Sequence, residues 1–354
     1  GVNSNDVNRE VWDVNGSQQI FNSQLSNKYT SEYTYNRPGL NLRLIRQKFN
    51  ILLGASWQTT KLSGNLISQG TEIEKSFDNV LPVARFNYDF TNFKRLRLDY
   101  ETSMQEPTIQ ELQPVVDNND PLNLSVGNPD LRPGYTHMIR TSFTAFDPGS
   151  FINLFTFITG RYTENAISTS QEVDMNLVRT TKPVNVSNNY SLDANIHFGL
   201  PIKKIKSRFG LSADATTSRA ITLLNLMENS IRQRTLGGRL TYSYNLNDIF
   251  NLDLEASIQQ QQSSYEFDVA DQLFLNKTYE AEANLKVLKN YQLNSGFQYL
   301  DYSSQTTGFS QVVPLLDISV SRFLLKNNTG ELKLGVKNLL DRNVSITPNF
   351  NSPV

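Results

Sequence analysis

The sequence predicts an all-β protein, an antiparallel transmembrane β-barrel, on three observations. Long segments alternate apolar and charged residues, the joints between them are alternately short and long, and most segments exceed the usual length of soluble strands. Successive side chains of a strand point to opposite faces, so an alternating segment has one apolar and one polar face. Many such segments in succession are typical of a sheet with lipid on one side and water on the other.

The alternation is clearest in residues 94–101, where Leu96, Leu98 and Tyr100 alternate with charged residues. The same pattern recurs in three later segments: residues 251–256, 280–287 and 331–337. A sandwich or a propeller could contain one such strand, but no fixed-period repeat supports a propeller or a β-helix. The succession of long alternating segments therefore favours the membrane barrel.

The composition is compatible with this prediction. The 354 residues have a mean hydropathy of −0.42, which resembles a soluble protein, but only alternate residues of a barrel strand face lipid. No apolar run has the length of a membrane helix. A net charge of −1 does not indicate a nucleic-acid partner, and the lack of cysteine excludes disulfides and thiolate metal sites. Residues 1–10 carry no signal-peptide pattern, so we expect a mature chain or a part of a longer one.

The joints divide into two classes that alternate along the chain. Short polar joints are predicted at residues 46–48, 91–94, 147–150, 200–207, 246–248, 289–290 and 326–329. Long polar loops are predicted at residues 63–79, 105–134, 164–182, 220–230 and 264–271, and residues 1–26 are predicted to belong to another. About fourteen strands lie between the joints, each of roughly ten to twenty residues, against the ~9–11 residues needed to cross a bilayer.

Two further features bear on the faces of these strands. Aromatic residues that an interfacial girdle would contain lie beside the short joints: Tyr88, Phe90, Phe93, Tyr242, Tyr244, Phe250, Tyr291 and Phe323. Residues 151–158 are apolar on both faces, which predicts contact with something inside the barrel or with another subunit.

Several motifs resemble one known family. The loop at 105–134 contains Pro-Thr-Ile-Gln-Glu-Leu at 107–112 and Gly-Asn-Pro-Asp-Leu-Arg-Pro at 127–133. Residues 335–343 read Gly-Val-Lys-Asn-Leu-Leu-Asp-Arg-Asn, and residues 182–185 and 200–204 carry further matches. In this order the motifs resemble the TonB-dependent outer-membrane transporter superfamily, and specifically its Bacteroidetes-type outer-membrane β-barrel proteins. Gly134 departs from the glutamate found in many members.

The resemblance implies a barrel of 22 strands with a folded plug in its lumen. We expect residues 1–354 to be a single C-terminal portion of that barrel, without the plug domain, the TonB box or the closing strand. The expected location is the outer membrane of a Gram-negative bacterium. The expected partners are outer-membrane lipid, the plug and TonB through the missing N-terminal part, and an outer-membrane lipoprotein or complex partner.

The polar face supplies the candidate site residues, which should face the lumen or the plug. They are Arg97, Asp99, Glu101, Arg239, Asp253, Glu255, Glu280, Glu282, Lys333 and Lys337. The alternative is a solvated polar face with no specific partner. None of these residues is singled out as a substrate ligand.

No cofactor, metal site or catalytic site is expected, and the chain is not expected to be an enzyme. His197 could pair with Asp193, but Asn195 is the nearer neighbour on the same face and no nucleophile elbow accompanies them. His137 is interpreted as a strand-surface residue. Residues 117–120, Asp-Asn-Asn-Asp, lack the glycine and distal glutamate of an EF-hand loop.

Four functions are compatible with these expectations. The first is energy-coupled import of an iron chelate, a cofactor, an oligosaccharide or a peptide, as the resemblance implies. The alternative is a structural or assembly component of an outer-membrane complex. An outer-membrane hydrolase would need an essential His197, and a passive porin would need an open lumen.

Overall fold

The computed structural model describes residues 2–9, 12–15, 18–21, 27–66, 71–247, 249–267, 271–306, 308–325 and 329–341. These residues form one 18-stranded sheet and a separate hairpin of β2 and β3. The strands before the longest loop are β1 (Val2–Arg9), β2 (Trp12–Asn15), β3 (Gln18–Phe21), β4 (Asn27–Asn36), β5 (Gly39–Ile45), β6 (Phe49–Leu66), β7 (Thr71–Thr91) and β8 (Lys94–Gln105).

The longest loop contains the short helix α1 (Ile109–Leu112) and strands β9 (Val116–Asp120) and β10 (Asn123–Val126). The strands that follow are β11 (Gly134–Phe146), β12 (Asn153–Val173), β13 (Arg179–Ile202), β14 (Ser207–Leu224), β15 (Met227–Leu246), β16 (Phe250–Tyr265), β17 (Gln272–Leu288), β18 (Tyr291–Ser304), β19 (Ser310–Leu324) and β20 (Gly330–Val336). A 3₁₀ turn, η1 (Lys203–Ile205), joins β13 to β14. Among the described residues, no helix is both long and apolar enough to cross a membrane.

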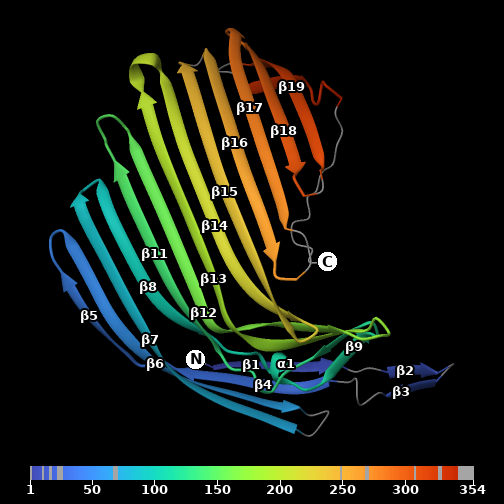
Figure 1. Ribbon diagram of the computed structural model, residues 1–354. Helices are drawn as coiled ribbons and strands as arrows, with labels where there is room; N and C mark the ends of the chain where they lie inside the picture. The colour runs from blue at the N-terminus through green and yellow to red at the C-terminus, as the bar shows by residue number, and fades with distance from the viewer. Residues whose placement is uncertain are drawn as a thin grey trace.

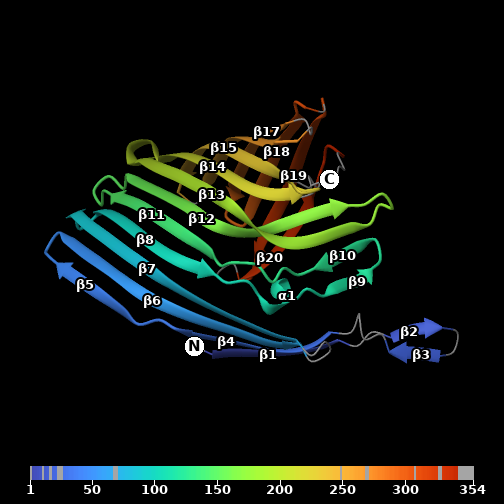
Figure 2. The same ribbon diagram turned by 60° about the horizontal axis from the view of Figure 1, so that its bottom comes forward.

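The strands pair as an antiparallel meander that curls into an open trough (Figures 1 and 2). β4 and β5 both pair with β6, and only Arg37 and Pro38 separate them, so they act as one interrupted strand. With β6, β7, β8 and the ten strands from β11 to β20, the meander has fourteen members. The predicted number of strands is therefore confirmed for the part of the chain that the structure describes.

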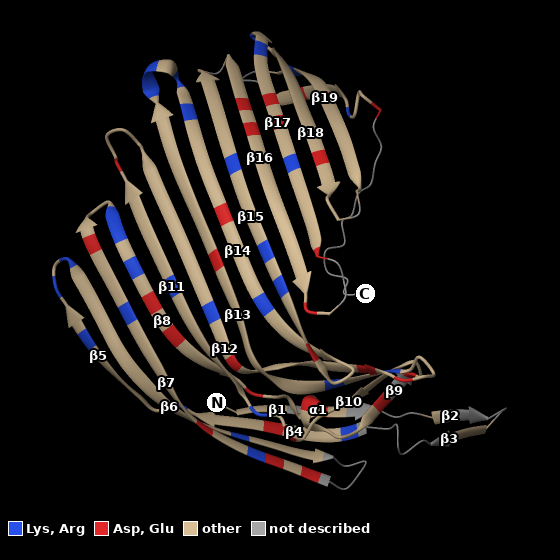
Figure 3. Ribbon diagram, in the orientation of Figure 1, with Lys and Arg blue, Asp and Glu red and all other residues tan. Residues whose placement is uncertain are grey.

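The registers assign every residue of the meander to one of two faces, because directly opposed residues of neighbouring strands share a face. One face is apolar and exposed: Leu240 is 59% and Leu334 is 71% accessible. The opposite face carries most of the charged residues, which are distributed over most of the strands (Figure 3), while the Lys277–Asp301 ion pair lies on the apolar face. Leu98 also lies exposed on the apolar face rather than in a protein core, so the sheet has the two-faced character that the alternation predicts.

All seven short joints occur between strands at the predicted positions, although residues 248 and 326–328 of two of them lie outside the described residues. The long loops are different. Residues 105–134 form a long loop, but most of the other four predicted loops continue the flanking hairpins. β12 and β13 leave only residues 174–178 between them, and β14 and β15 leave only Asn225 and Leu226. These strand extensions are mostly polar, and their apolar residues Ala166, Val186 and Ile221 form a small buried cluster rather than an exposed, lipid-facing row.

The extensions make the strands far longer than a membrane crossing. β13 has 24 residues, which corresponds to roughly 80 Å at ~3.3 Å per residue, against a hydrocarbon core of about 30 Å. The prediction of a loop over residues 1–26 was also wrong in part, because β1, β2 and β3 lie there and β1 pairs with β4. Residues 1, 10, 11, 16, 17 and 22–26 lie outside the described residues.

Aromatic side chains form contacts at the short-turn end, as the girdle hypothesis expects. Tyr88 packs edge-on to Phe90 with ring centroids 4.7 Å apart, and Phe209 lies 4.9 Å from Tyr242. Phe323 is an exception. Its register partner is Glu331, so it lies on the charged face, while Arg322 lies on the apolar face over the ring of Tyr291.

Candidate functional site: the charged inner face and the loop folded onto it

The candidate site residues share the charged face of the sheet. The registers place nine of the ten there, and Lys337 follows the last residue of β20. The helix α1 lies against this same face: a Cβ added at Gly64 of β6 would meet the side chain of Ile109. Because a folded element covers part of it, we name this surface the inner face. What these residues bind remains a prediction.

Three neighbouring strands, β7, β8 and β11, carry a ladder of ion pairs that we name the paired wall. Asp99 of β8 lies between two guanidinium groups, with its carboxylate 2.7 Å from Arg85 Nε and 2.6 Å from Arg97 Nε. On either side along the ladder, Asp89 pairs with Arg95 and Glu101 pairs with Arg140. The charges of the paired wall are thus compensated within the sheet itself.

The neighbouring strands β16 and β17 present a different surface, which we name the acidic wall. Asp253 lies directly opposite Glu282, and Glu255 lies directly opposite Glu280, so two like-charged pairs face each other across the β16–β17 ladder. Like charges in opposed positions are destabilising. Within the described residues, Glu255 has an ion pair, 3.0 Å from Arg239 Nε, and the other three have none.

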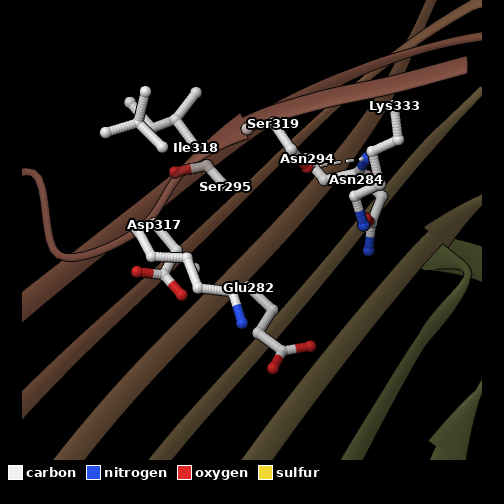
Figure 4. A pocket seen from close by; sticks show the side chains of 12 residues that line it. Glu282, Asn284, Asn294, Ser295, Asp317, Ile318, Ser319 and Lys333 are labelled. Atoms are coloured by element: carbon white, nitrogen blue, oxygen red, sulfur yellow. Dashed lines mark hydrogen bonds between the residues drawn. The ribbon is translucent and has the colours of Figure 1, made fainter.

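A shallow pocket lies beside the acidic wall, between β17 and β20 (Figure 4). Its volume is about 420 Å³, and it brings together Glu282, Asp317, Lys333 and Lys337. The Asp317 carboxylate accepts a hydrogen bond of 2.7 Å from the backbone N–H of Asn338. The motif at residues 335–343 therefore begins in the last two residues of β20 and continues as a turn tied to β19, while its Arg342 and Asn343 lie outside the described residues.

Two phenylalanines also lie on the inner face. Phe157 of β12 is opposed to Ser142 and Asn195, and its side chain is 47% exposed. Two residues earlier, Phe155 stacks on the ring of His197 with an interplanar angle of 15°. Residues 153–158 thus have apolar side chains on both faces of the sheet, as predicted.

The loop between β8 and β11 folds back onto the inner face beyond the paired wall. Its helix α1 begins with a capping box, in which Thr108 and Glu111 satisfy each other's backbone N–H groups. Ile109 and Leu112 are buried, and they join Leu62, Ile73 and Leu131 in a small hydrophobic core. The motif at 107–112 is therefore an anchor that fixes the loop on the sheet.

The two loop motifs interlock with a third, and we name this assembly the loop clamp. Asn128 accepts a hydrogen bond from Asp130 N–H, donates its own backbone N–H to Glu111 O and donates its side-chain amide to Pro183 O at 3.0 Å. Asn185 accepts from the backbone N–H of Arg132 at 2.8 Å and donates back to its carbonyl. The motifs at 107–112, 127–133 and 182–185 thus meet at one place.

A polar cluster beneath the loop is also buried. Gln58, only 2% exposed, donates to Glu106 at 2.8 Å and also contacts Thr60 and Arg37. Glu106 accepts a second hydrogen bond from Thr60. Sequence reasoning missed this cluster, because its members lie in segments that looked like ordinary loop or strand and are far apart along the chain.

In the part of the chain that the structure describes, the residues considered for chemistry make contacts typical of strand surfaces and turns. His197 Nδ1 lies 2.9 Å from Ser212 Oγ, but no carboxylate pairs with this histidine in the described part of the chain. His137 contacts Tyr100 OH at 2.9 Å. The Asp120 carboxylate accepts hydrogen bonds from the Asn123 side chain and the Leu122 N–H, which lower its pKa, so it serves a turn. No group of three metal-ligating side chains occurs among the described residues.

Solved structures of outer-membrane proteins resemble this chain at low similarity. A loop-deletion mutant of OmpT from Vibrio cholerae is 9% identical, with a TM-score of 0.29 over 96% of this chain and 94% of that one. FpvA of P. aeruginosa, bound to a pyoverdine–iron complex, is 10% identical, with a TM-score of 0.30 over 88% of this chain and 58% of its own. The Escherichia coli outer-membrane transporter YddB is 9% identical, with a TM-score of 0.28 over 83% and 52%.

This chain therefore spans just over half the length of FpvA and of YddB. No curated protein sequence matches it. A family model described as the outer membrane protein beta-barrel family matches residues 2–220, more than half of the chain. With a sheet that is apolar on one face and charged on the other, this match assigns the protein to the outer membrane, and the chain belongs to the outer membrane protein beta-barrel family.

Proposed function

We propose that the chain forms the wall of a TonB-dependent receptor that imports a scarce nutrient, with a plug domain seated against its inner face. In this proposal residues 1–354 are the C-terminal portion of a 22-stranded barrel of the Bacteroidetes type. The plug and the TonB box lie upstream, and the proton gradient of the inner membrane supplies the energy. The substrate is an iron chelate, a cofactor, an oligosaccharide or a peptide.

One observation carries the choice of a plugged lumen over an open pore: the exposed Phe157 side chain on the inner face. Exposed apolar area costs about 25 cal/mol per Å² relative to burial, so a water-filled channel gains nothing from a phenylalanine there. A plug that covers it would gain that free energy. The uncompensated carboxylates of the acidic wall support the same proposal, because basic groups of a plug would offset their mutual repulsion.

Site-specific photo-crosslinking in the full-length protein tests the plug. A photoreactive amino acid at Phe157 should crosslink within the same polypeptide to a segment upstream of this chain, identified by mass spectrometry. The matched control is Ile158, the next residue along β12, whose side chain lies on the apolar face and should crosslink to lipid. Equal labelling of Phe157 and Ile158 by lipid, or labelling of Phe157 by water alone, would contradict the proposal.

Nutrient uptake tests the energy coupling. Cells that express the full-length protein are supplied in turn with ferric chelate, cobalamin, oligosaccharide or peptide as the limiting nutrient, with TonB present or deleted. We expect one class to depend on both the protein and TonB, and to be lost when residues 105–134 are replaced by a short turn. Uptake that persists without TonB would instead favour a pore.

A structural or assembly role is the second candidate, and the apolar residues at 153–158 favour it if their partner is another subunit. A stoichiometric polypeptide, separate from the chain itself, would then be the product crosslinked to Phe157. The same experiment therefore separates the two functions.

A further inference from the structure

We propose that the outer face of β13–β16 holds one anionic glycerophospholipid, with an acyl chain in an apolar groove and the phosphate on the lysines of the β13–β14 turn. This inference concerns the lipid-facing surface and is independent of the proposed import function. It depends on a groove and a cluster of positive charge that adjoin each other.

The groove is built from side chains of the apolar face on four successive strands. It has a volume of about 480 Å³, and its apolar lining includes Phe198, Leu200, Phe209, Leu211, Leu240 and Leu254. Ala256 also lines the groove, and its small side chain is opposed to the larger Leu240 and Tyr279 on the neighbouring strands. The lining is almost wholly apolar, which suits a hydrocarbon chain and would suit a polar ligand poorly.

The positive charge begins where the groove ends. Leu200 and Phe209 are opposed residues at the end of the groove, and the turn that follows them contains Lys203, Lys204 and Lys206. Lys203 contacts the neighbouring turn between β11 and β12, because its ammonium group donates to Gly149 O at 3.0 Å and lies over the ring of Phe151. Lys206 donates to a neutral partner, Asn247 Oδ1, at 3.0 Å.

Lys204 is exposed and has no hydrogen-bonded or ion-paired partner among the residues that the structure describes. Lys204 and Lys206 therefore retain positive charge that no carboxylate compensates. Lysines at a membrane surface attract anionic headgroups, and each raises the affinity by a factor of about five. The Tyr242 hydroxyl, 3.1 Å from Ser207 Oγ, marks the level at which the groove changes from apolar to polar. The apolar groove, the tyrosine and the lysines follow one another in the same order as the acyl chain, the glycerol region and the headgroup of a phospholipid. The positive charge of the lysines favours an anionic headgroup.

Native mass spectrometry of the full-length protein, titrated with dioleoylphosphatidylglycerol or dioleoylphosphatidylcholine, tests the headgroup. The wild type should prefer phosphatidylglycerol, and K204Q/K206Q should lower that affinity roughly thirtyfold, to the level of phosphatidylcholine. The matched control is K48Q/K289Q, which removes two lysines from other short turns at the same end of the sheet. Equal loss in the two double variants, or no loss in K204Q/K206Q, would overturn the proposal.

A second variant pair tests the groove. Ala256→Leu should fill it and weaken binding of both lipids, whereas Ala281→Leu, on the outer face of β17 beside the groove, should leave binding unchanged. Lipid binding that survives Ala256→Leu would overturn the acyl-chain part, as would complete displacement of the lipid by glycerol phosphate, which has a headgroup and no chains. So would a stoichiometric polypeptide that occupies the groove in place of lipid.

Discussion

The two halves of the meander differ in how the charges of their inner face are paired. In the half that ends near β13, the paired wall compensates its own charges, and the loop clamp ties the loop motifs to the sheet. In the half from β14 onward, the acidic wall sets like charges opposite each other, and the long-loop side has only short connections. Each carboxylate of the paired wall has a guanidinium partner, while three of the four carboxylates of the acidic wall have no ion pair among the described residues. The family match, residues 2–220, covers the first half and most of β14.

Breaking the loop clamp should have the largest effect. A Cβ at Gly127 would overlap the backbone of Gln113, so Gly127→Ala should release the loop and cost about 1–3 kcal/mol of overpacking. Limited proteolysis should then cut between residues 105 and 134. Gly296→Ala in the second half is the control, because its Cβ would meet nothing within 4 Å. Protease resistance in both variants would show that the loop clamp accommodates the added Cβ without releasing the loop, which would contradict this prediction.

Removing one carboxylate from each wall should change the free energy of unfolding in different ways. Asp99→Asn leaves two guanidinium groups without their partner and should lower the free energy of unfolding by roughly 1–2 kcal/mol, a value reduced because Arg85 and Arg97 are 43% and 48% exposed. Asp253→Asn removes a repulsion and should be neutral or slightly stabilising. Urea titration in lipid vesicles measures both. A larger loss for Asp253→Asn would contradict the distinction between the walls.

Replacing a glutamate by lysine on each wall should shift the stability of the protein in opposite directions. Glu282→Lys places a cation opposite Asp253 and should stabilise the isolated sheet by about 0.2–1 kcal/mol. Glu101→Lys, the matched reversal on the paired wall, sets a cation against Arg140 and should destabilise. The same urea titrations apply, and a shift of the same sign in both variants would refute the assignment.

The smallest effect is expected at the turn that closes β11 and β12 of the first half. The Ser150 hydroxyl and the N–H groups of Gly149 and Ser150 lower the pKa of Asp147. A lowered folded-state pKa contributes stability above the unfolded value near 3.9, and that stability is lost as the pH falls through the folded value. Asp147→Asn should therefore melt slightly earlier than wild type at pH 7, and the difference should shrink towards zero at strongly acidic pH. A difference in melting temperature that does not change with pH would show that the effect does not come from the charge of Asp147.

Local patterns were sufficient to predict the sheet, but contacts between distant segments were not. Alternation placed the strand interiors and the turn residues placed the seven short joints, because both depend on nearest neighbours. The extensions of β12 to β15 escaped notice, because their sequences are rich in polar residues and their few apolar side chains meet in a buried cluster that only the folded sheet brings together. Alternation also identified the face of Asp99 and of Asp253, but not which carboxylate is paired, since pairing depends on registers that the sequence does not reveal. The buried cluster of Gln58 and Glu106 was missed for the same reason.

The loop clamp has a consequence for the order in which the molecule assembles. Neighbouring hairpins can close one after another, since each new strand meets only the strand before it. The bond from Asn128 to Pro183 is different, because 55 positions separate its ends and β11, β12 and β13 must all be in place before it can form. Loop 105–134 should therefore remain accessible during insertion and become fixed late, so that its protection from protease reports when this part of the wall has matured.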